Sequence, residues 1–291
     1  KTPPMTTKSP NFKSPMTGSN IYADNNATTA LDPAIAERMH ELYLAGPLNP
    51  ASQHRRGRQA LRLLEDAKTG LLAELGAAFE GMDAAQVILT SGGTEANNLA
   101  IRGYALARSA TVIVGATEHP SVLDSARALG PKKFRVLPAN ADGMLDLDVL
   151  RQWLREDAAS IGLVSVMLGN NETGIIPDLE SICQLCRKFG VPVHSDAVQA
   201  VGKLAVNLTQ LGLSAVSLTA HKLHGPVGIG ALVLLAGEKV DPILLGGGQQ
   251  LGLRPGTEPV VPAVALEMAV RLASTARRAG VYERLAALRD D

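Results

Sequence analysis

The sequence contains only two cysteines and nine aromatic residues (one Trp, four Tyr, four Phe), and it has no net charge. Two cysteines exclude a disulfide scaffold. Because 28 basic side chains balance 28 acidic ones, the sequence lacks the basic excess of a general nucleic-acid binder. Aromatic side chains are too scarce to form the surface on which the bases of single-stranded nucleic acid stack. No stretch reaches the roughly 18 uncharged apolar residues of a membrane helix. We therefore expect neither nucleic acid nor membrane as a partner.

The two ends of the sequence differ in composition from its middle. Residues 1–20 are rich in Pro, Ser, Thr and Lys and have no apolar core of a secretory signal, which predicts a flexible tail. Residues 282–289 have an amphipathic helical pattern with no visible cap. We expect from this that the sequence is cut before its natural end.

Short apolar runs alternate with helical patterns from about residue 55 onward, and helices are expected near residues 61–75 and 178–189. Each run is rich in β-branched residues or Leu and apolar on both faces, which predicts strands buried on both sides. The alternation predicts an α/β fold of three layers, in which a mainly parallel sheet has helices on both faces. The predicted strands are 87–89, 112–114, 134–137, 161–168, 191–193, 215–218 and 231–235.

The turn after the first predicted strand has the features of an anion site. Two glycines, Gly92 and Gly93, allow a ligand to approach the backbone closely, and Ser91 and Thr94 are expected to cap a helix from about Glu95. The free N–H groups at such a helix start suit a phosphate. An ordinary capped glycine turn is the alternative.

Three later turns carry polar side chains at strand ends, where ligands bind in such sheets. His119 is a candidate acid, base, metal ligand or stacking ring, or a structural residue. Asp196 follows a buried strand and needs a cation or donors, unless it or Ser195 caps a helix. Lys222 lies among small and apolar residues, which favours a nucleophilic free amine. An ordinary surface lysine in a polar turn is the alternative. Together with the anion site, these groups are the set that pyridoxal phosphate requires.

Nine segments, in order and spacing, resemble the cysteine desulfurases of the class V aminotransferase group, which have the fold-type-I pyridoxal-phosphate scaffold. The resemblance covers about residues 21–289 and implies a cofactor-binding large domain over residues 21–275, with its first segment joining a small domain. Residues 276–291 would begin that small C-terminal domain, most of which is missing. The matching segments are 22–29, 49–52, 90–100, 117–119, 169–174, 196–203, 221–226, 246–249 and 254–258.

The resemblance implies a role for each matching side chain around the cofactor ring. Lys222 would hold the cofactor covalently and move the proton at the substrate Cα. Asp196 would pair with the pyridinium nitrogen, and His119 would stack on the ring and transfer protons. Gln199 would bond the phenolic oxygen, and Asn171 would sit beside that oxygen and the substrate carboxylate.

The resemblance also implies how the phosphate is bound. Gly93, Thr94, Thr219 and His221 would form its cradle. Thr257 would reach the phosphate from the other subunit, so that the site is complete only in a homodimer. Thr219 stands where the family usually has Ser, and its hydroxyl keeps the expected bond to phosphate.

The implied reaction converts L-cysteine to L-alanine and passes the sulfur to an enzyme thiolate as a persulfide. A sulfur-acceptor or scaffold protein would then receive it, for iron–sulfur cluster or thio-cofactor synthesis. The sequence departs from the family because no cysteine follows Cys186, whereas the family's loop cysteine lies about a hundred residues beyond the lysine. Cys183 and Cys186 are expected to be buried structural residues. Gln250 and Leu251 replace a common Glu-Arg pair, a change expected to affect the subunit contact or the loop over the site.

Two other functions remain open from the sequence. One is another class V enzyme, such as a selenocysteine lyase. The other is a non-catalytic scaffold subunit with the same fold. The free-thiol chemistry and the lack of a secretory signal favour a cytoplasmic location. No metal site is expected. Residues 1–291 alone are expected to bind the cofactor weakly or not at all and not to turn cysteine over.

Overall fold

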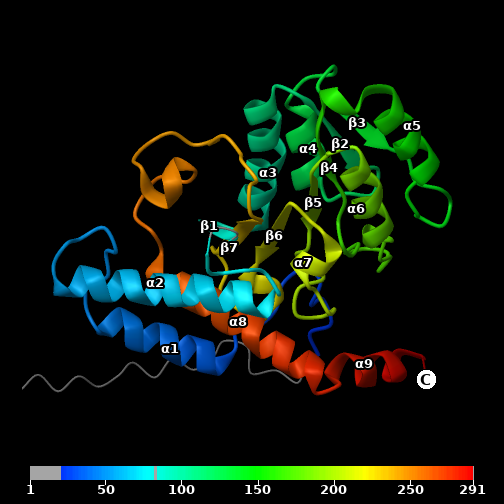
Figure 1. Cartoon of the computed structure of the whole chain (residues 1–291). Helices are drawn as coiled ribbons and strands as arrows, with labels where there is room; N and C mark the ends of the chain where they lie inside the picture. The colour runs from blue at the N-terminus through cyan, green and yellow to red at the C-terminus, as the bar shows by residue number, and fades with distance from the viewer. Residues whose placement is uncertain (1–20, 82–83, 291) are drawn as a thin grey trace, which may run out of the picture.

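The computed structural model describes residues 21–81 and 84–290, which form one seven-stranded sheet with helices on both faces (Figure 1). The predicted tail, residues 1–20, lies outside the described residues. The strand order is β1-β7-β6-β5-β4-β2-β3. Only β7 runs antiparallel, to both β1 and β6, and the other pairs are parallel. The strands are β1 Gln86–Thr90, β2 Thr111–Gly115, β3 Phe134–Leu137, β4 Ile161–Ser165, β5 Val193–Asp196, β6 Ala215–Thr219 and β7 Gly230–Leu234.

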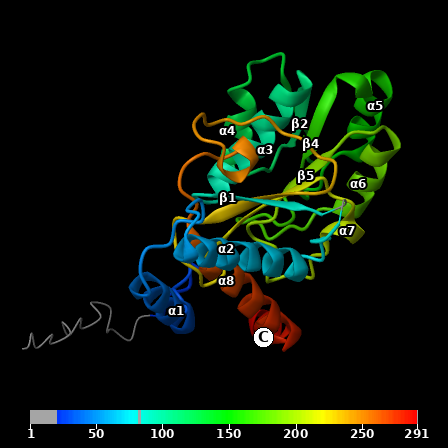
Figure 2. The same cartoon turned by 60° about the vertical axis from the view of Figure 1, so that its left-hand side comes forward.

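The helices form two layers, each with its own apolar core. Helices α3 (Gly93–Arg108) and α4 (Pro120–Arg127) cover one face, and the others cover the opposite face, where α1 packs on α8 (Figures 1 and 2). Side chains alternate between the cores along β1, since Ile88 faces α3 and its neighbours face α2. The other helices are α1 Pro33–Leu44, α2 Arg55–Glu74, α5 Leu147–Asp157, α6 Leu179–Lys188, α7 Leu208–Leu211, α8 Val260–Arg278 and α9 Val281–Asp290, with short 3₁₀ segments η1 Ala158–Ser160, η2 Ala220–Lys222 and η3 Gln249–Gly252.

The predicted three-layer fold is confirmed, with three differences at the strands. The run 161–168 leaves the strand after Ser165. Strand β5 spans 193–196 rather than 191–193, in keeping with Pro192, which lacks a ladder N–H. As a result Asp196 is the last residue of the strand itself. Burial on both faces is wrong for β3, because β3 lies at the sheet edge and Val136 is 40% exposed.

The start of α3 also differs from the prediction. The helix begins at Gly93, two residues before Glu95, and its N-cap residue Gly92 makes no side-chain capping bond. Capping by Ser91 and Thr94 is therefore wrong. Instead the carboxylate of Glu95 reaches back and accepts the backbone N–H of Ser91 at 2.7 Å. The side chain that binds a backbone N–H at this turn is therefore Glu95 rather than a serine or threonine.

The predicted helices near 61–75 and 178–189 are confirmed as α2 and α6. The predicted domain boundary at residue 275 falls within α8, and the chain turns at Gly280 into α9. The division into two domains stays a prediction. Within the described residues, no helix combines the length and apolar character needed to span a membrane.

Gly230 is the residue that lets β7 enter the sheet between β1 and β6. A Cβ atom there would lie 2.6 Å from the Leu218 carbonyl oxygen and 2.7 Å from the Gly92 carbonyl carbon. Because both contacts are backbone, we expect Gly230→Val to lower the free energy of unfolding by about 3 kcal/mol or more. Urea denaturation measures this. Gly248→Val, where a Cβ meets nothing within 4 Å, is the control, and equal midpoints for the two variants would contradict the expectation.

Candidate active site

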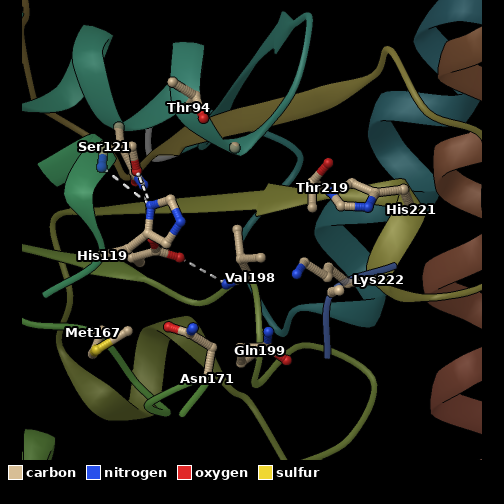
Figure 3. A pocket seen from close by; sticks show the side chains of 14 residues that line it. Thr94, His119, Ser121, Met167, Asn171, Val198, Gln199, Thr219, His221 and Lys222 are labelled. Carbon is tan, nitrogen blue, oxygen red and sulfur yellow. Dashed lines mark hydrogen bonds between the residues drawn. The ribbon is translucent and has the colours of Figure 1, made fainter. Parts of the chain in front are cut away.

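A cavity of about 270 Å³ lies at the carboxyl ends of the parallel strands (Figure 3). It holds nine of the ten residues predicted for the cofactor, which come from the first turn of α3, the ends of β5 and β6, η2, and the turns after β2, β4 and β5. Of the ten, Thr257 alone does not line it. The nine are Gly93, Thr94, His119, Asn171, Asp196, Gln199, Thr219, His221 and Lys222.

Asp196 places a buried carboxylate on the cavity wall. Its side chain accepts the N–H of Val198 at 3.0 Å and the amide of Asn97 at 2.7 Å. Burial nevertheless raises the pKa of Asp196 above its ordinary value. The alternative of a helix cap at Asp196 or Ser195 is wrong, since only turns follow β5 and the Ser195 hydroxyl is buried with no partner among the described residues. A cation in the cavity would relieve the cost of burying this charge.

Lys222 enters the cavity from η2, and its Nζ donates a hydrogen bond to the backbone oxygen of Asn26. Burial lowers the pKa of Lys222, although Asp24 and Asp196 act in the opposite direction. The neighbouring His221 has its pKa lowered by burial and then by the charge of Lys222. Both shifts favour neutral nitrogen atoms, and a neutral lysine amine is a nucleophile.

The first turn of α3 and the end of β6 form one end of the cavity, which we call the anion cup: Gly93, Thr94, Thr219 and His221. The first N–H groups of a helix have no partner within it, so they are free to bind an anion. A Cβ on Gly93 would come within 2.8 Å of a Val198 methyl group, which explains glycine at this position. The cup supplies the donors and the space that a phosphate requires.

His119 is the N-cap of α4, and its ring lines the cavity (Figure 3). Its Nδ1 accepts the backbone N–H of Ser121 at 3.1 Å. The neutral ring therefore carries its proton on Nε2. This arrangement leaves His119 with an N–H that can donate to a ligand.

Sequence reasoning missed several residues of the site. Asn97 is 1% exposed and lies on the buried face of α3, where a polar residue among Ala and Leu was the available signal. Met167 and Ala27 line the cavity, and neither carries a recognisable chemical signal. Asn26 contacts the site residue Asn171 across 145 positions of sequence, and Lys203 contacts Asn26 across 177.

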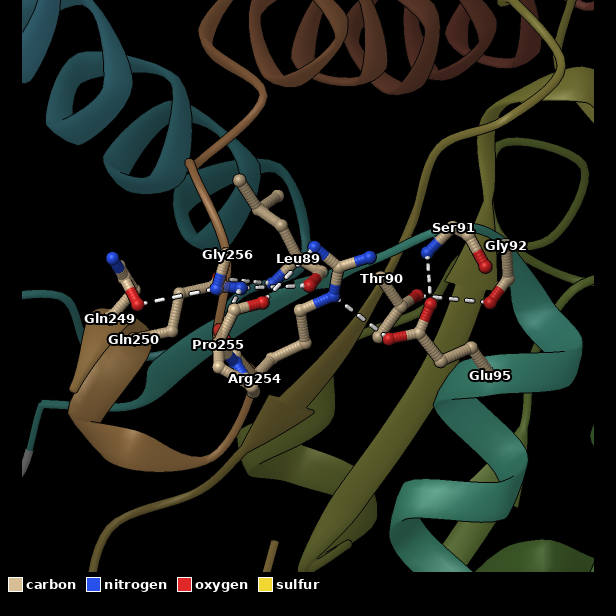
Figure 4. Close-up of polar contacts among 10 residues, drawn as sticks. All are labelled: Leu89, Thr90, Ser91, Gly92, Glu95, Gln249, Gln250, Arg254, Pro255 and Gly256. Carbon is tan, nitrogen blue, oxygen red and sulfur yellow. Dashed lines mark hydrogen bonds and ion pairs between the residues drawn. The ribbon is translucent and has the colours of Figure 1, made fainter. Parts of the chain in front are cut away.

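The segment that precedes Thr257, residues 249–256, is held against β1 and against Glu95 in the first turn of α3 (Figure 4). The Gln250 amide accepts the Leu89 N–H at 2.7 Å and donates to the Leu89 oxygen at 2.9 Å, so it pairs with β1 as a further strand would. Arg254 Nε lies 3.0 Å from the Glu95 carboxylate. Burial acts to raise the pKa of Glu95, but hydrogen bonds from Arg254 and Ser91 outweigh it and hold the pKa below its usual value.

The two contacts to Leu89 explain why glutamine suits position 250. A carboxylate can accept the Leu89 N–H, but it cannot donate to the Leu89 oxygen. We expect Gln250→Glu to lower the free energy of unfolding by about 1–3 kcal/mol, as measured by urea denaturation at pH 8. The control is Gln249→Glu at a half-buried neighbour. An equal loss in both variants would contradict this role for the amide.

Both cysteines lie on α6, away from the cavity. Cys183 is 1% exposed and Cys186 is fully buried, so the predicted burial is confirmed. Burial raises the pKa of each thiol to about 12. Neither cysteine can supply a thiolate at neutral pH.

Comparisons with known proteins agree with this geometry. The family model described as aminotransferase class V matches residues 21–290. A cysteine desulfurase IscS of Pectobacterium carotovorum is 41% identical in an alignment 280 residues long, which covers 93% of this chain and 67% of that protein. A NifS-like protein from Rickettsia africae superposes with a TM-score of 0.82 at 32% identity, over 88% of this chain and 69% of that one. A structure described as SspA in complex with cysteine gives 0.77 at 29%, over 87% and 72%.

Proposed function

Because this chain belongs to the class V aminotransferase family, as a member of its cysteine desulfurase group, we propose that it removes sulfur from L-cysteine and releases L-alanine. The family's cofactor is pyridoxal phosphate. The observation that carries the proposal is the convergence of Lys222, Asp196 and the anion cup on one cavity. No metal enters the proposal.

The residues of the cavity fit that cofactor group by group. The aldehyde requires an amine with a lowered pKa, and Lys222 provides one. The pyridinium nitrogen requires a buried carboxylate, and Asp196 has one on the cavity wall. The phosphate requires free N–H groups and hydroxyls, which the cup has. The sequence predicts weak or no cofactor binding by residues 1–291, and no finding tests that prediction. Since all these groups lie between residues 93 and 222, we propose instead that these residues take up a measurable amount of cofactor.

Each side chain has a stated task in the reaction. When bound, the cofactor ring accepts the electrons left at the substrate Cα after its proton is removed. Lys222 Nζ takes that proton and returns it to a neighbouring atom, as a general base and acid. Asp196 keeps the ring nitrogen protonated. His119 stacks beside it with its Nε2 proton available, while Gln199 and Asn171 orient the polar groups of cofactor and substrate.

The sulfur step needs a thiol from outside the described core. The carbon–sulfur bond of cysteine breaks, a sulfur–sulfur bond to the acceptor thiolate forms, and protonation of the remaining carbon gives alanine. Cys183 and Cys186 are excluded as acceptors by their burial. The sulfur passes to an enzyme thiolate other than these two, as a persulfide, and then to a separate acceptor for iron–sulfur cluster or thio-cofactor synthesis. The protein acts as a homodimer in which Thr257 reaches the other subunit's cup.

Exchange of the Cα proton tests this function without any acceptor thiol. The protein is loaded with pyridoxal phosphate, freed of excess cofactor by gel filtration, and mixed with L-cysteine in D₂O. We expect NMR to show loss of the Cα proton signal for L-cysteine but not for D-cysteine. Exchange no faster than in the protein-free filtrate would overturn the proposal.

A further inference from the structure

Lys203 lies behind the cavity, at the end of the turns that follow β5. It is half-buried, and its Nζ donates to Gln199 Oε1 at 2.7 Å and to Asn26 Oδ1 at 3.4 Å. Together with Lys222 it lines a second cavity of about 470 Å³. Lys203 therefore contacts two residues of the site while lying outside the first cavity.

The contact with Gln199 fixes which way its amide points. An ammonium group can only donate hydrogen bonds, so it selects the carbonyl end of the amide. The NH₂ end of Gln199 is then turned away from Lys203, and it donates to the Asn26 backbone oxygen at 2.9 Å. Because a backbone oxygen can only accept, both contacts select the same orientation of this amide.

The same logic applies to the N-terminal strap, which we define as residues 22–29. The Asn26 side chain accepts from Lys203 through Oδ1 and donates through Nδ2 to the Asn171 backbone oxygen at 3.3 Å. Its backbone oxygen accepts from both Lys222 and Gln199. Asn26 thus links Lys222 to the turn after β4. The bond from Lys203 to Oδ1 favours the orientation of the Asn26 amide in which Nδ2 faces Asn171.

Lys203 also acts through its charge. The groups that act on the Lys222 amine are Asp24 from the strap and Asp196 from β5, which favour the ammonium form, with His221 beside it in η2. Burial and then the charge of Lys222 lower the pKa of Lys203. Both lysines donate to Asn26, Lys222 to its backbone oxygen and Lys203 to its side chain. Because repulsion between two ammonium groups is mutual, a protonated Lys203 opposes the two carboxylates.

We propose that Lys203 is a positioning residue that fixes the amides of Gln199 and Asn26 and keeps the neighbouring Lys222 amine neutral. Its use in catalysis rests on the proposed function, because a neutral Lys222 is what reacts with the cofactor aldehyde. The contacts themselves exist without the cofactor, so they can be tested on cofactor-free protein.

Amine labelling across a range of pH measures the ionisation of Lys222 directly. Cofactor-free protein is treated with a trace of acetic anhydride at each pH, and mass spectrometry follows the Lys222 peptide. We expect Lys203→Met to raise the midpoint for Lys222 by about 0.5–1 pH unit. The sign follows because removing a nearby positive charge makes the ammonium form of Lys222 easier to keep. Lys203→Arg retains the charge and keeps the wild-type midpoint.

Two further variants make the result decisive. Lys132→Met removes an exposed lysine and serves as the control. Lys203→Gln replaces Lys203→Met if melting curves show that the latter does not fold. Equal midpoints in the wild type and the neutral variants would overturn the role of Lys203. Failure of the wild type to take up pyridoxal phosphate would overturn the proposed function alone, since the labelling uses no cofactor.

Discussion

We expect borohydride reduction of the cofactor-loaded wild type to leave a pyridoxyl group on Lys222, and we expect no such group on the Lys222→Ala variant. The reason is that Lys222 combines a position in the cavity with a pKa lowered by burial, and alanine has no amine. We further expect exchange of the substrate Cα proton to fall by about 10³-fold or more. Mass spectrometry locates the tag, and NMR in D₂O measures the exchange.

The matched control is Lys132→Ala. We expect this variant to carry the pyridoxyl group on Lys222 and to exchange the Cα proton at the wild-type rate. Non-covalent uptake persists in Lys222→Ala, because the anion cup and Asp196 are unchanged. Lys203 is the main alternative site of attachment for the cofactor, since it lines the second cavity together with Lys222. A tag on Lys203 in the wild type would show that the wrong lysine has been assigned.

Asp196→Asn is expected to make the cofactor-free protein more stable and the loaded protein much less active. In the cofactor-free state the ionised carboxylate is buried against one N–H and one amide. Asparagine keeps an acceptor for the Val198 N–H, and its NH₂ can meet Asn97 Oδ1, which has no partner among the described residues. We expect a gain of about 1–2 kcal/mol at pH 8.

The pH dependence of this gain follows from the raised pKa of Asp196. The native protein holds the carboxyl proton to a higher pH than the unfolded chain does. Stability is therefore lost as pH rises from about 4, the unfolded pKa, through the native pKa. The advantage of asparagine is largest above that window and vanishes below it. Glu118, also fully buried with a raised pKa, changes in the same direction in both proteins and cancels in the comparison.

With cofactor bound, the effect of Asp196→Asn reverses. Asparagine cannot keep the ring nitrogen protonated, so we expect exchange of the Cα proton to slow by about 10²–10³-fold. Thermal melts from pH 4 to 8, without and with cofactor, measure the change in stability. The exchange assay measures the loss of activity. A variant less stable than the wild type at pH 8 without cofactor would refute the argument from burial.

The sequence predicted best what depends on local pattern. Buried runs and the turns after them placed Lys222, Asp196 and His119 at one sheet edge, because parallel strands bring their carboxyl ends together. It failed where a neighbouring side chain takes the partner of a predicted cap, and where residues distant in the sequence meet. Ser91 and Thr94 have the right chemistry for caps, but Glu95 takes the Ser91 N–H. The contacts of Asn26 with Lys203 and Lys222 join segments 177 and 196 positions apart, and no period in the sequence encodes them.

The position of β7 has a consequence for how the protein folds. Strands β1 and β6 carry the two halves of the anion cup, yet neither pairs with the other, because β7 lies between them and bonds to both. The register that joins Thr90 and Thr219 to Gly230 closes a loop of about 140 residues on one side. Such non-local pairing is slow and comes after local helices have formed. The phosphate-binding end is therefore assembled late, by the strand that supplies none of its ligands.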